Sequence, residues 1–146
     1  MSHFVHRLQV RFRDCDPMGH VNNAVYFTYL EQTRLAHWQT SWGFAPRPAQ
    51  SRLRSSESWT STEPPDLLGV IIAHAECDYR RAARFGEMLE VRMRVATIGR
   101  TSFTYDYEIV DAQGQIVATA RTVQVMYDYA EEKPVPIPDN IRALLS

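Results

Sequence analysis

The sequence predicts an α+β fold in which one long central helix is wrapped by an antiparallel five-stranded sheet. Residues 24–38 contain no Gly or Pro and carry apolar or aromatic side chains around most of a helical circumference, which is typical of a buried helix. Residues 67–129 show short segments of period two separated by brief turn signals, a pattern that favours antiparallel strands. Because a helix this apolar must be covered, we expect one face of the sheet to wrap it.

Length and charge limit the class of protein further. A chain of 146 residues fits one domain, taken as residues 1–146, and it is long enough to bury a core. Its 16 basic and 17 acidic residues give a net charge of −1, so no bulk field attracts nucleic acid or an anionic membrane.

The cysteines and the amino terminus bear on location and cofactors. Cys15 and Cys77 cannot form a disulfide framework and show no paired metal-ligand spacing, which favours a reducing compartment. The amino terminus has no apolar signal core, and no run approaches the 18 apolar residues of a membrane span. We therefore expect a cytoplasmic protein with no metal, no cofactor, and no membrane or nucleic-acid partner.

The first elements follow from periodicity and breakers. Residues 4–12 alternate between two faces and predict a first strand. The helix that starts near residue 24 should end at Trp42 and Gly43, with the glycine just past the helix and Pro46 preventing its resumption. Residues 45–66 are rich in Ser, Pro and Arg and poor in large apolar groups, so we expect a mobile loop, either a solvated connector or a lid over a ligand.

The second half predicts four strands, over residues 70–79, 88–98, 102–110 and 115–127. The breaks between them are short, which predicts a meander of antiparallel neighbours. Three later prolines, at positions 134, 136 and 138, should exclude regular sheet, and a last short helix is expected over residues 140–145, capped by Asp139. Because the edges and outer face of such a sheet need cover, we expect a homodimer or homotetramer.

The densest chemistry lies in residues 14–26. Pro17 and Gly19 predict a turn, and Asn22 or Asn23 is a natural helix N-cap. The carboxylate of Asp16 therefore precedes the start of a buried helix, whose first N–H groups are unpaired and carry partial positive charge. Such N–H groups can stabilise an oxyanion. Glu31, three residues before Arg34 on the same helix, suggests an ion pair.

These residues resemble a known family. The run Val10-x-Phe12-x-Asp14-x-Asp16-x-x-Gly19-His20-Val21-Asn22-Asn23-x-x-Tyr26-x-x-Tyr29-x-Glu31-x-x-Arg34 is similar to that of hotdog-fold acyl-CoA thioesterases of the 4-hydroxybenzoyl-CoA thioesterase group. Residues 78–87 and 98–103 continue the resemblance, which covers most of the chain outside residues 45–66 and the last fifteen.

The resemblance implies hydrolysis of an acyl-CoA thioester, and it implies roles for particular residues. Asp16 would act as nucleophile or as general base for water, and the backbone N–H of Asn23 would bind the carbonyl oxygen. Residues expected to contact the substrate are His20, Val21, Asn22, Tyr26 and Arg81. Asp14 keeps a structural interpretation, and Tyr26 is expected to form core or pocket wall.

Other interpretations stay open. The basic residues Arg80, Arg81 and Arg84 suit either coenzyme A phosphates or a solvated sheet edge. His20 can position the substrate or share a proton with Asp16, which also leaves room for a hotdog dehydratase or hydratase. Cys15 is expected to be a small filler, with a Cys–His nucleophile as the alternative. A non-catalytic protein that binds acyl-CoA or aromatic-CoA is a further possibility.

Overall fold

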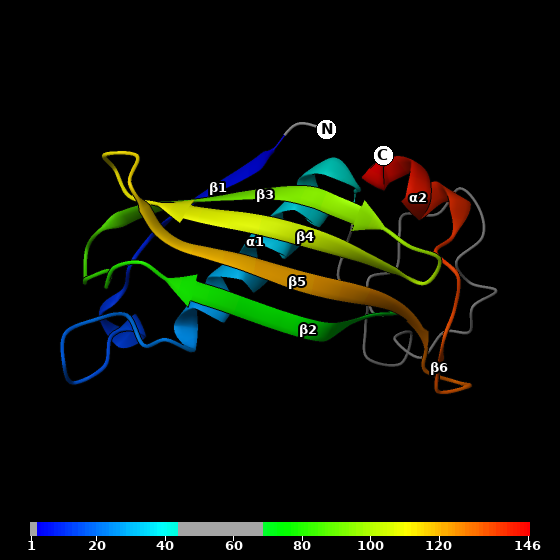
Figure 1. Cartoon of the computed structure of the whole chain (residues 1–146), viewed down its shortest axis with the longest axis horizontal. Helices are drawn as coiled ribbons and strands as arrows, with labels where there is room; N and C mark the ends of the chain where they lie inside the picture. The colour runs from blue at the N-terminus through cyan, green and yellow to red at the C-terminus, as the bar shows by residue number, and fades with distance from the viewer. Residues whose placement is uncertain (1–2, 44–68) are drawn as a thin grey trace.

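The computed structural model describes residues 3–43 and 69–146, in which a single sheet wraps around one long helix (Figure 1). The sheet consists of β1 (Phe4–Gln9), β2 (Val70–Tyr79), β3 (Met88–Ile98), β4 (Ser102–Val110), β5 (Ile116–Asp128) and the two-residue β6 (Lys133–Pro134). The helices are α1 (Val25–Ser41), the short α2 (Asp139–Leu145) and a 3-10 turn, η1 (Phe12–Asp14). The loop expected over residues 45–66 lies outside the described residues.

Most predicted elements are confirmed within one or two residues. β1 is shorter than predicted because its last expected residues turn into η1, where the ring of Phe12 is exposed. Gly43 has φ 69° just beyond α1, as expected of a residue that ends a helix. α2 starts at Asp139, but Pro138 is its N-cap and no side chain caps it, so the capping role predicted for Asp139 is wrong.

Pro134 was expected to exclude regular sheet, yet it pairs with Tyr127 in β6. This pairing is possible because β6 is two residues long and lies at an edge, where the N–H that proline lacks is not needed. The five longer strands run in the order β1-β3-β4-β5-β2, and β6 adds to β5 as the sixth.

The predicted meander is correct for β3, β4 and β5 and wrong for β2. β2 pairs with β5 at the edge opposite β1, so β2 and β3 are not neighbours. The connecting segment, residues 80–87, is no hairpin turn. Its backbone bonds instead to the first part of the chain: Ala83 C=O accepts from Val21 N–H at 2.9 Å, and Gly86 N–H donates to Val10 C=O at 3.0 Å. These bonds bring residues 80–83 beside the turn that precedes α1.

The core lies between α1 and the inner face of the sheet. Alternate residues of β3 and β4 face inward, among them Leu89, Met93, Tyr105 and Ile109, all at most 1% exposed. Leu30 of α1 is fully buried among them, and burial of such a side chain contributes about 1.5–3 kcal/mol.

One polar residue of α1 also points inward. Arg34 donates to the hydroxyl of Tyr107 at 3.2 Å, and within the described ranges it forms no ion pair with Glu31. The ion pair predicted between Glu31 and Arg34 is therefore wrong: the guanidinium reaches the sheet, whereas Glu31 is exposed.

Candidate active site

The loop before α1 is closed by its own backbone. Asp16 N–H donates to His20 C=O at 2.8 Å, and Gly19 N–H donates to Asp16 C=O at 3.0 Å. Gly19 has φ 82°, a conformation that glycine adopts without the strain of a side chain. Cys15 and Val21 form a bridge at the base of the loop, so residues 15–21 form a compact turn.

The carboxylate of Asp16 is held by one oxygen. Its Oδ1 accepts hydrogen bonds from the backbone N–H of Met18 at 2.9 Å and of His20 at 3.4 Å. No residue in the described ranges donates to Oδ2. The side chain is therefore oriented by the turn while one oxygen stays available to a ligand.

The start of α1 differs from the prediction in one respect. Asn22 Oδ1 accepts from Ala24 N–H at 3.0 Å, but Ala24 is the N-cap, so neither Asn22 nor Asn23 caps the helix. The Asn23 C=O accepts from the hydroxyl of Tyr79 at 2.8 Å, which ties the helix start to the end of β2. In the described part of the chain the Asn23 N–H has no acceptor, and it lies where the partial positive charge of α1 is concentrated.

These groups line a pocket of about 350 Å³, called the motif pocket below. It contains six of the predicted site residues: Asp16, His20, Val21, Asn23, Tyr26 and Arg81. Asn22 does not line it. Three further residues come from the end of β2 and the connecting segment, namely Tyr79, Arg80 and Ala82. Figure 1 shows this end of the fold, where the loop before α1 lies beside the end of β2.

Tyr26 forms a wall of the motif pocket. It is 2% exposed, its hydroxyl accepts from Ala83 N–H at 3.2 Å, and its ring lies edge-on to Tyr79 with centroids 5.1 Å apart. Burial raises the pKa of this phenol, so it stays neutral at physiological pH. This environment fits the pocket wall predicted from the sequence.

Arg81 lines the motif pocket, but its guanidinium is already occupied. Nη2 donates to Glu87 Oε1 at 2.6 Å and to Asp111 Oδ2 at 2.9 Å, and Nη1 donates to Glu87 Oε2 at 3.2 Å. These hydrogen bonds lower the pKa of the Glu87 and Asp111 carboxyls. The same bonds raise the pKa of Arg81. Arg81 therefore joins the connecting segment to the β4–β5 turn. Its neighbour Arg80 forms no ion pair within the described ranges.

Asp14 has the structural role expected of it. It is 2% exposed and accepts hydrogen bonds from Tyr29 Oη at 2.8 Å, Arg11 N–H at 2.9 Å and Arg11 Nη2 at 2.9 Å. Burial raises the pKa of this carboxyl, but the hydrogen bonds outweigh burial and hold the pKa below its ordinary value. Asp14 thereby fixes η1 against α1, two residues before Asp16.

The side chains of His20 and Cys15 form no hydrogen bond with the Asp16 carboxylate in the described part of the chain. Among residues 3–43 and 69–146, Cys15 Sγ has one weak hydrogen bond, to Arg11 C=O at 3.8 Å, and it packs against the core, as a small filler does.

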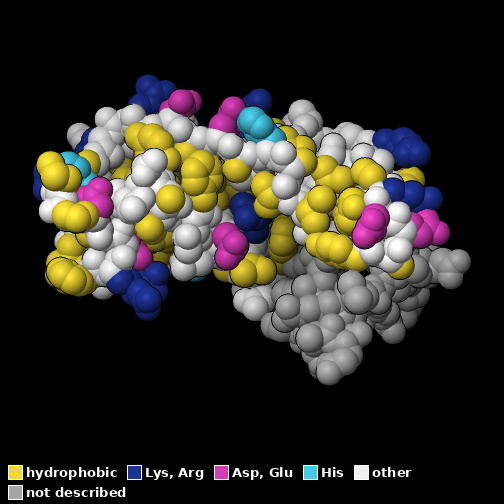
Figure 2. All heavy atoms as spheres, turned by 90° about the horizontal axis from the view of Figure 1, so that it is seen from below, with side chains coloured by type: hydrophobic (Ala, Val, Ile, Leu, Met, Phe, Trp, Pro, Cys, Tyr) yellow, Lys and Arg dark blue, Asp and Glu magenta, His cyan; other side chains and the backbone are white. Residues whose placement is uncertain are grey.

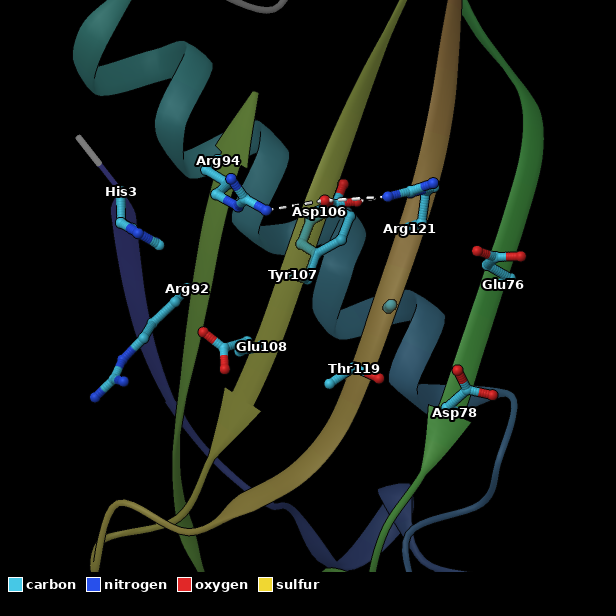
Figure 3. Close-up of a pocket in the computed structure, with 11 residues that line it drawn as sticks. His3, Glu76, Asp78, Arg92, Arg94, Asp106, Tyr107, Glu108, Thr119 and Arg121 are labelled. Atoms are coloured by element: carbon cyan, nitrogen blue, oxygen red, sulfur yellow. Dashed lines mark hydrogen bonds and ion pairs between the residues drawn. The ribbon is translucent and has the colours of Figure 1, made fainter. Parts of the chain in front are cut away.

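A second cavity, of about 400 Å³, lies on the outer face of the sheet and contains none of the predicted site residues (Figure 3). Three of its charged side chains pair with one another: Asp106 accepts from Arg121 Nε at 2.7 Å and from Arg94 Nη2 at 3.3 Å. The cavity is a charged face of the sheet, away from the loop that precedes α1. Among residues 3–43 and 69–146, no three His, Cys, Asp or Glu side chains are grouped to hold a metal, and no helix is long and apolar enough to span a membrane.

Comparison with known proteins agrees with the fold and with the family that the sequence resembles. The chain is 27% identical over 142 residues to a 1,4-dihydroxy-2-naphthoyl-CoA hydrolase of Synechococcus elongatus, covering 97% of this chain and 94% of the relative. It resembles a Thermus thermophilus thioesterase solved with coenzyme A and Zn, at 28% identity and TM-score 0.72, covering 97% and 95% of the two chains.

A 4-hydroxybenzoyl-CoA thioesterase with 4-hydroxybenzoyl-CoA bound shares the fold, with TM-score 0.79, 17% identity and full coverage of both chains. The hotdog fold expected from the sequence is thus confirmed. The model of the thioesterase-like superfamily matches residues 10–145, which includes the loop, α1 and the whole sheet beyond β1. The chain therefore belongs to the thioesterase-like superfamily.

Proposed function

We propose that this protein hydrolyses acyl-CoA thioesters to the free acid and coenzyme A, with the reaction taking place in the motif pocket. One observation carries the proposal: the Asp16 carboxylate, with one oxygen held and the other without a donor in the described ranges, shares a pocket with the unpaired N–H of Asn23. A carboxylate can act as nucleophile or general base in acyl transfer, and a fixed N–H donor can stabilise the oxyanion that develops on the carbonyl oxygen.

Asp16 acts in one of two ways. As a nucleophile, its Oδ2 bonds to the thioester carbonyl carbon, the C–S bond breaks, and water then hydrolyses the acyl-aspartyl anhydride to regenerate the carboxylate. As a general base, Asp16 accepts a proton from water while the water oxygen bonds to the same carbon and the thiolate leaves. A thiolate whose conjugate acid has a pKa of about 8.5 leaves readily, so no strong general acid is needed.

Asn23 supplies the oxyanion site in this proposal. Its backbone N–H, at the N-terminal end of α1, donates to the carbonyl oxygen as negative charge develops there. Removal of one such donor in other acyl-transfer enzymes costs about 3 kcal/mol of transition-state stabilisation. The hydroxyl of Tyr79, bonded to the Asn23 C=O, holds this residue in position.

The residues predicted to contact the substrate have two kinds of role in this proposal: some line the motif pocket, and others hold its walls in place. His20, Val21 and Tyr26 line the motif pocket around the thioester, and Asn22 acts through the turn that precedes α1. Arg80, whose guanidinium is free of carboxylates in the described ranges, is suited to a phosphate of coenzyme A, whereas Arg81 positions the connecting segment. The relatives named as acyl-CoA hydrolases, and the related structure with coenzyme A bound, support this substrate class.

The assembly we propose is a homodimer or homotetramer. Most side chains of the edge strand β2 are exposed, including Ile72 at 43% and Tyr79 at 44%. An exposed ten-residue edge is a template for pairing with another copy of the strand. Light scattering tests the assembly, and the mass of a single chain at assay concentration would contradict it.

The test of the chemistry is release of free thiol from short-chain, long-chain and aromatic acyl-CoAs, followed with a thiol reagent. We expect Asp16→Asn and Asp16→Ala to lower kcat by about 10²- to 10⁴-fold with unchanged circular dichroism. Asp139→Asn, an exposed position on α2, is the matched control and should retain wild-type turnover.

The remaining outcomes point elsewhere. Wild-type turnover in Asp16→Asn refutes the assignment of Asp16. Binding of acyl-CoA without thiol release by the wild type favours a non-catalytic binding protein. Hydration or dehydration of an enoyl or hydroxyacyl thioester would favour the hydratase alternative, although the imidazole of His20 makes no hydrogen bond to Asp16 within the described ranges.

A further inference from the structure

Arg34 is a buried cation without an anionic partner among the described residues. Its side chain lies on the inward face of α1, and the residue is 7% exposed. Nη1 donates to Tyr107 Oη at 3.2 Å, and this is its one hydrogen bond in the described ranges. A guanidinium has five N–H donors, so most of its hydrogen-bonding capacity is unused there.

The polar groups of the sheet beside Arg34 are neutral, so they cannot supply the negative charge that would balance the guanidinium. The Tyr107 hydroxyl is bonded to Thr122 Oγ1 at 2.7 Å, Thr122 Oγ1 is in short contact with Gln124 Oε1, and Gln124 Nε2 donates to Phe103 C=O at 3.0 Å. Each hydroxyl thus donates away from Arg34, and Tyr107 is left to accept from it. Burial raises the pKa of Tyr107, although Arg34 lowers it, so the phenol stays neutral.

Arg34 faces another cavity, in the space between α1 and β2, called the distal pocket below. Its volume is about 250 Å³, and its lining includes Phe27, Glu31, Arg34, Ile72, Ala75 and Thr122. The register shift in β2 between Ile72 and His74 inserts one extra residue, which keeps Ile72 and Ala75 on the same inner side. Figure 2 views this side of the molecule, where hydrophobic side chains gather with a few charged groups among them.

The distal pocket and the motif pocket are lined from the same side of α1. Phe27, Glu31 and Arg34 are spaced by four and three residues, so they form one stripe along α1, and Asn23 lies just before the helix, four residues ahead of Phe27. The helix rises about 1.5 Å per residue, which places Arg34 about 10 Å beyond Phe27 along the axis. Helical side chains lean toward the N-terminus, and the guanidinium therefore reaches back toward the motif pocket.

We propose that Arg34 recognises the far end of the acyl group and that this end carries an anionic oxygen, with a carboxylate as the best match. The inference rests on the proposed function. In this proposal a thioester bound at Asp16 and Asn23 extends its acyl group along the stripe, past Phe27, from the motif pocket to the guanidinium in the distal pocket. A carboxylate would fill two of the unused donors in a bidentate pair and neutralise the buried charge.

Glu31 is the acidic residue that lies nearest to Arg34 along the stripe on α1. It lines the distal pocket, but it is exposed and, among the described residues, forms no ion pair with Arg34, so water screens its charge more than that of the buried Arg34. The lining of the distal pocket thus combines the apolar side chain of Phe27, the buried cation of Arg34 and the exposed carboxylate of Glu31.

The test compares kcat/KM for three aromatic thioesters of similar length: 4-methylbenzoyl-CoA, 4-hydroxybenzoyl-CoA and 4-carboxybenzoyl-CoA. We expect the wild type to prefer the 4-carboxy over the 4-methyl substrate. In Arg34→Met this preference should fall by about 10- to 100-fold, the effect of losing a hydrogen bond to a charged group. A general loss of activity from altered packing affects both substrates and cancels in the ratio.

Two further variants keep the test decisive. Tyr107→Phe removes the acceptor that orients the guanidinium, and the preference should fall by a smaller factor. If Arg34→Met does not fold, Arg34→Lys decides, because it keeps the charge but not the bidentate geometry and should lower the preference partially.

An unchanged substrate ratio in the folded Arg34 variants overturns the inference, as does a wild-type preference for the 4-hydroxy or 4-methyl substrate. Dissociation of an oligomer by Arg34→Met, with the ratio unchanged, would overturn it too and assign Arg34 to a subunit contact. If no thioester is hydrolysed by the wild type, the proposed function fails instead.

Discussion

Substitution of Asp14 separates the structural carboxylate of the loop from the catalytic one proposed two residues later. Asp14→Asn keeps the size of the side chain but removes the charge that receives hydrogen bonds from Tyr29 and Arg11. The bond to Tyr29 is buried and carries most of the effect, because a hydrogen bond to a charged group contributes about 1.5–3 kcal/mol. The Arg11 side chain is 55% exposed, so its ion pair adds little. We expect the free energy of unfolding to fall by about 2–4 kcal/mol at pH 7.

The dependence on pH provides the sharper check. Hydrogen bonds hold the pKa of Asp14 in the folded protein below its ordinary value of 3.8. The unfolded chain therefore takes up the proton first, so the stabilisation is fully present well above pH 3.8 and is lost as the pH falls through the folded pKa. The variant has no carboxyl at this position. The other carboxyls with lowered pKa are shared by both proteins and cancel in the difference.

Urea unfolding of the wild type and Asp14→Asn between pH 7 and pH 3 measures this difference. It should be largest at pH 7 and should narrow below about pH 4. Folded Asp14→Asn should retain thioester hydrolysis, in contrast to Asp16→Asn, which should be stable and inactive. A loss below about 0.5 kcal/mol at pH 7, or a difference that does not change with pH, would refute the structural role assigned to Asp14.

Three other substitutions have defined outcomes. Arg81→Gln should lower the free energy of unfolding by about 1–3 kcal/mol, because it leaves two carboxylates without their shared cation, and an unchanged urea midpoint would contradict this. Arg80→Gln, its neighbour, should leave stability unchanged and raise KM for acyl-CoA severalfold, whereas an unaltered KM would remove Arg80 from the binding site. Tyr79→Phe should lower kcat about 5- to 10-fold, since it frees the Asn23 C=O; a change in KM alone would show that Tyr79 acts in binding.

Local patterns were sufficient to predict most of the helices and strands and the turn that contains Asp16. Alternation predicted β3 and β4, with Leu89 and Tyr105 on the buried faces, because side chains of a strand point to opposite sides at a fixed period of two. The absence of Gly and Pro over residues 24–38 and the position of Gly43 predicted α1 and its end. Asp16, Gly19 and His20 are near neighbours in sequence, so the turn that joins them follows from local geometry.

The partners of distant residues were not predictable in this way. A turn at residues 84–86 was expected to make β2 and β3 neighbours, but residues 80–87 cross to β3 beside the opposite edge strand β1, and their backbone groups bond to Val10 and Val21. That crossing places Tyr79 and Arg80 in the motif pocket and pairs Arg81 with Glu87 and Asp111. No spacing rule indicates the contact between Arg81 and Asp111, which are thirty residues apart in the chain.

The sequence by itself determined the periodicities, the breakers and the Asp16 turn before the helix, since each depends on residues a few positions apart. Only the tertiary structure decided that Arg34 bonds to Tyr107 rather than to Glu31. The choice depends on which face of α1 the sheet covers, because a guanidinium on the covered face reaches a strand before it reaches water. The same packing gives Asn23 its neighbour Tyr79 and brings the helix start and the end of β2 together as one site.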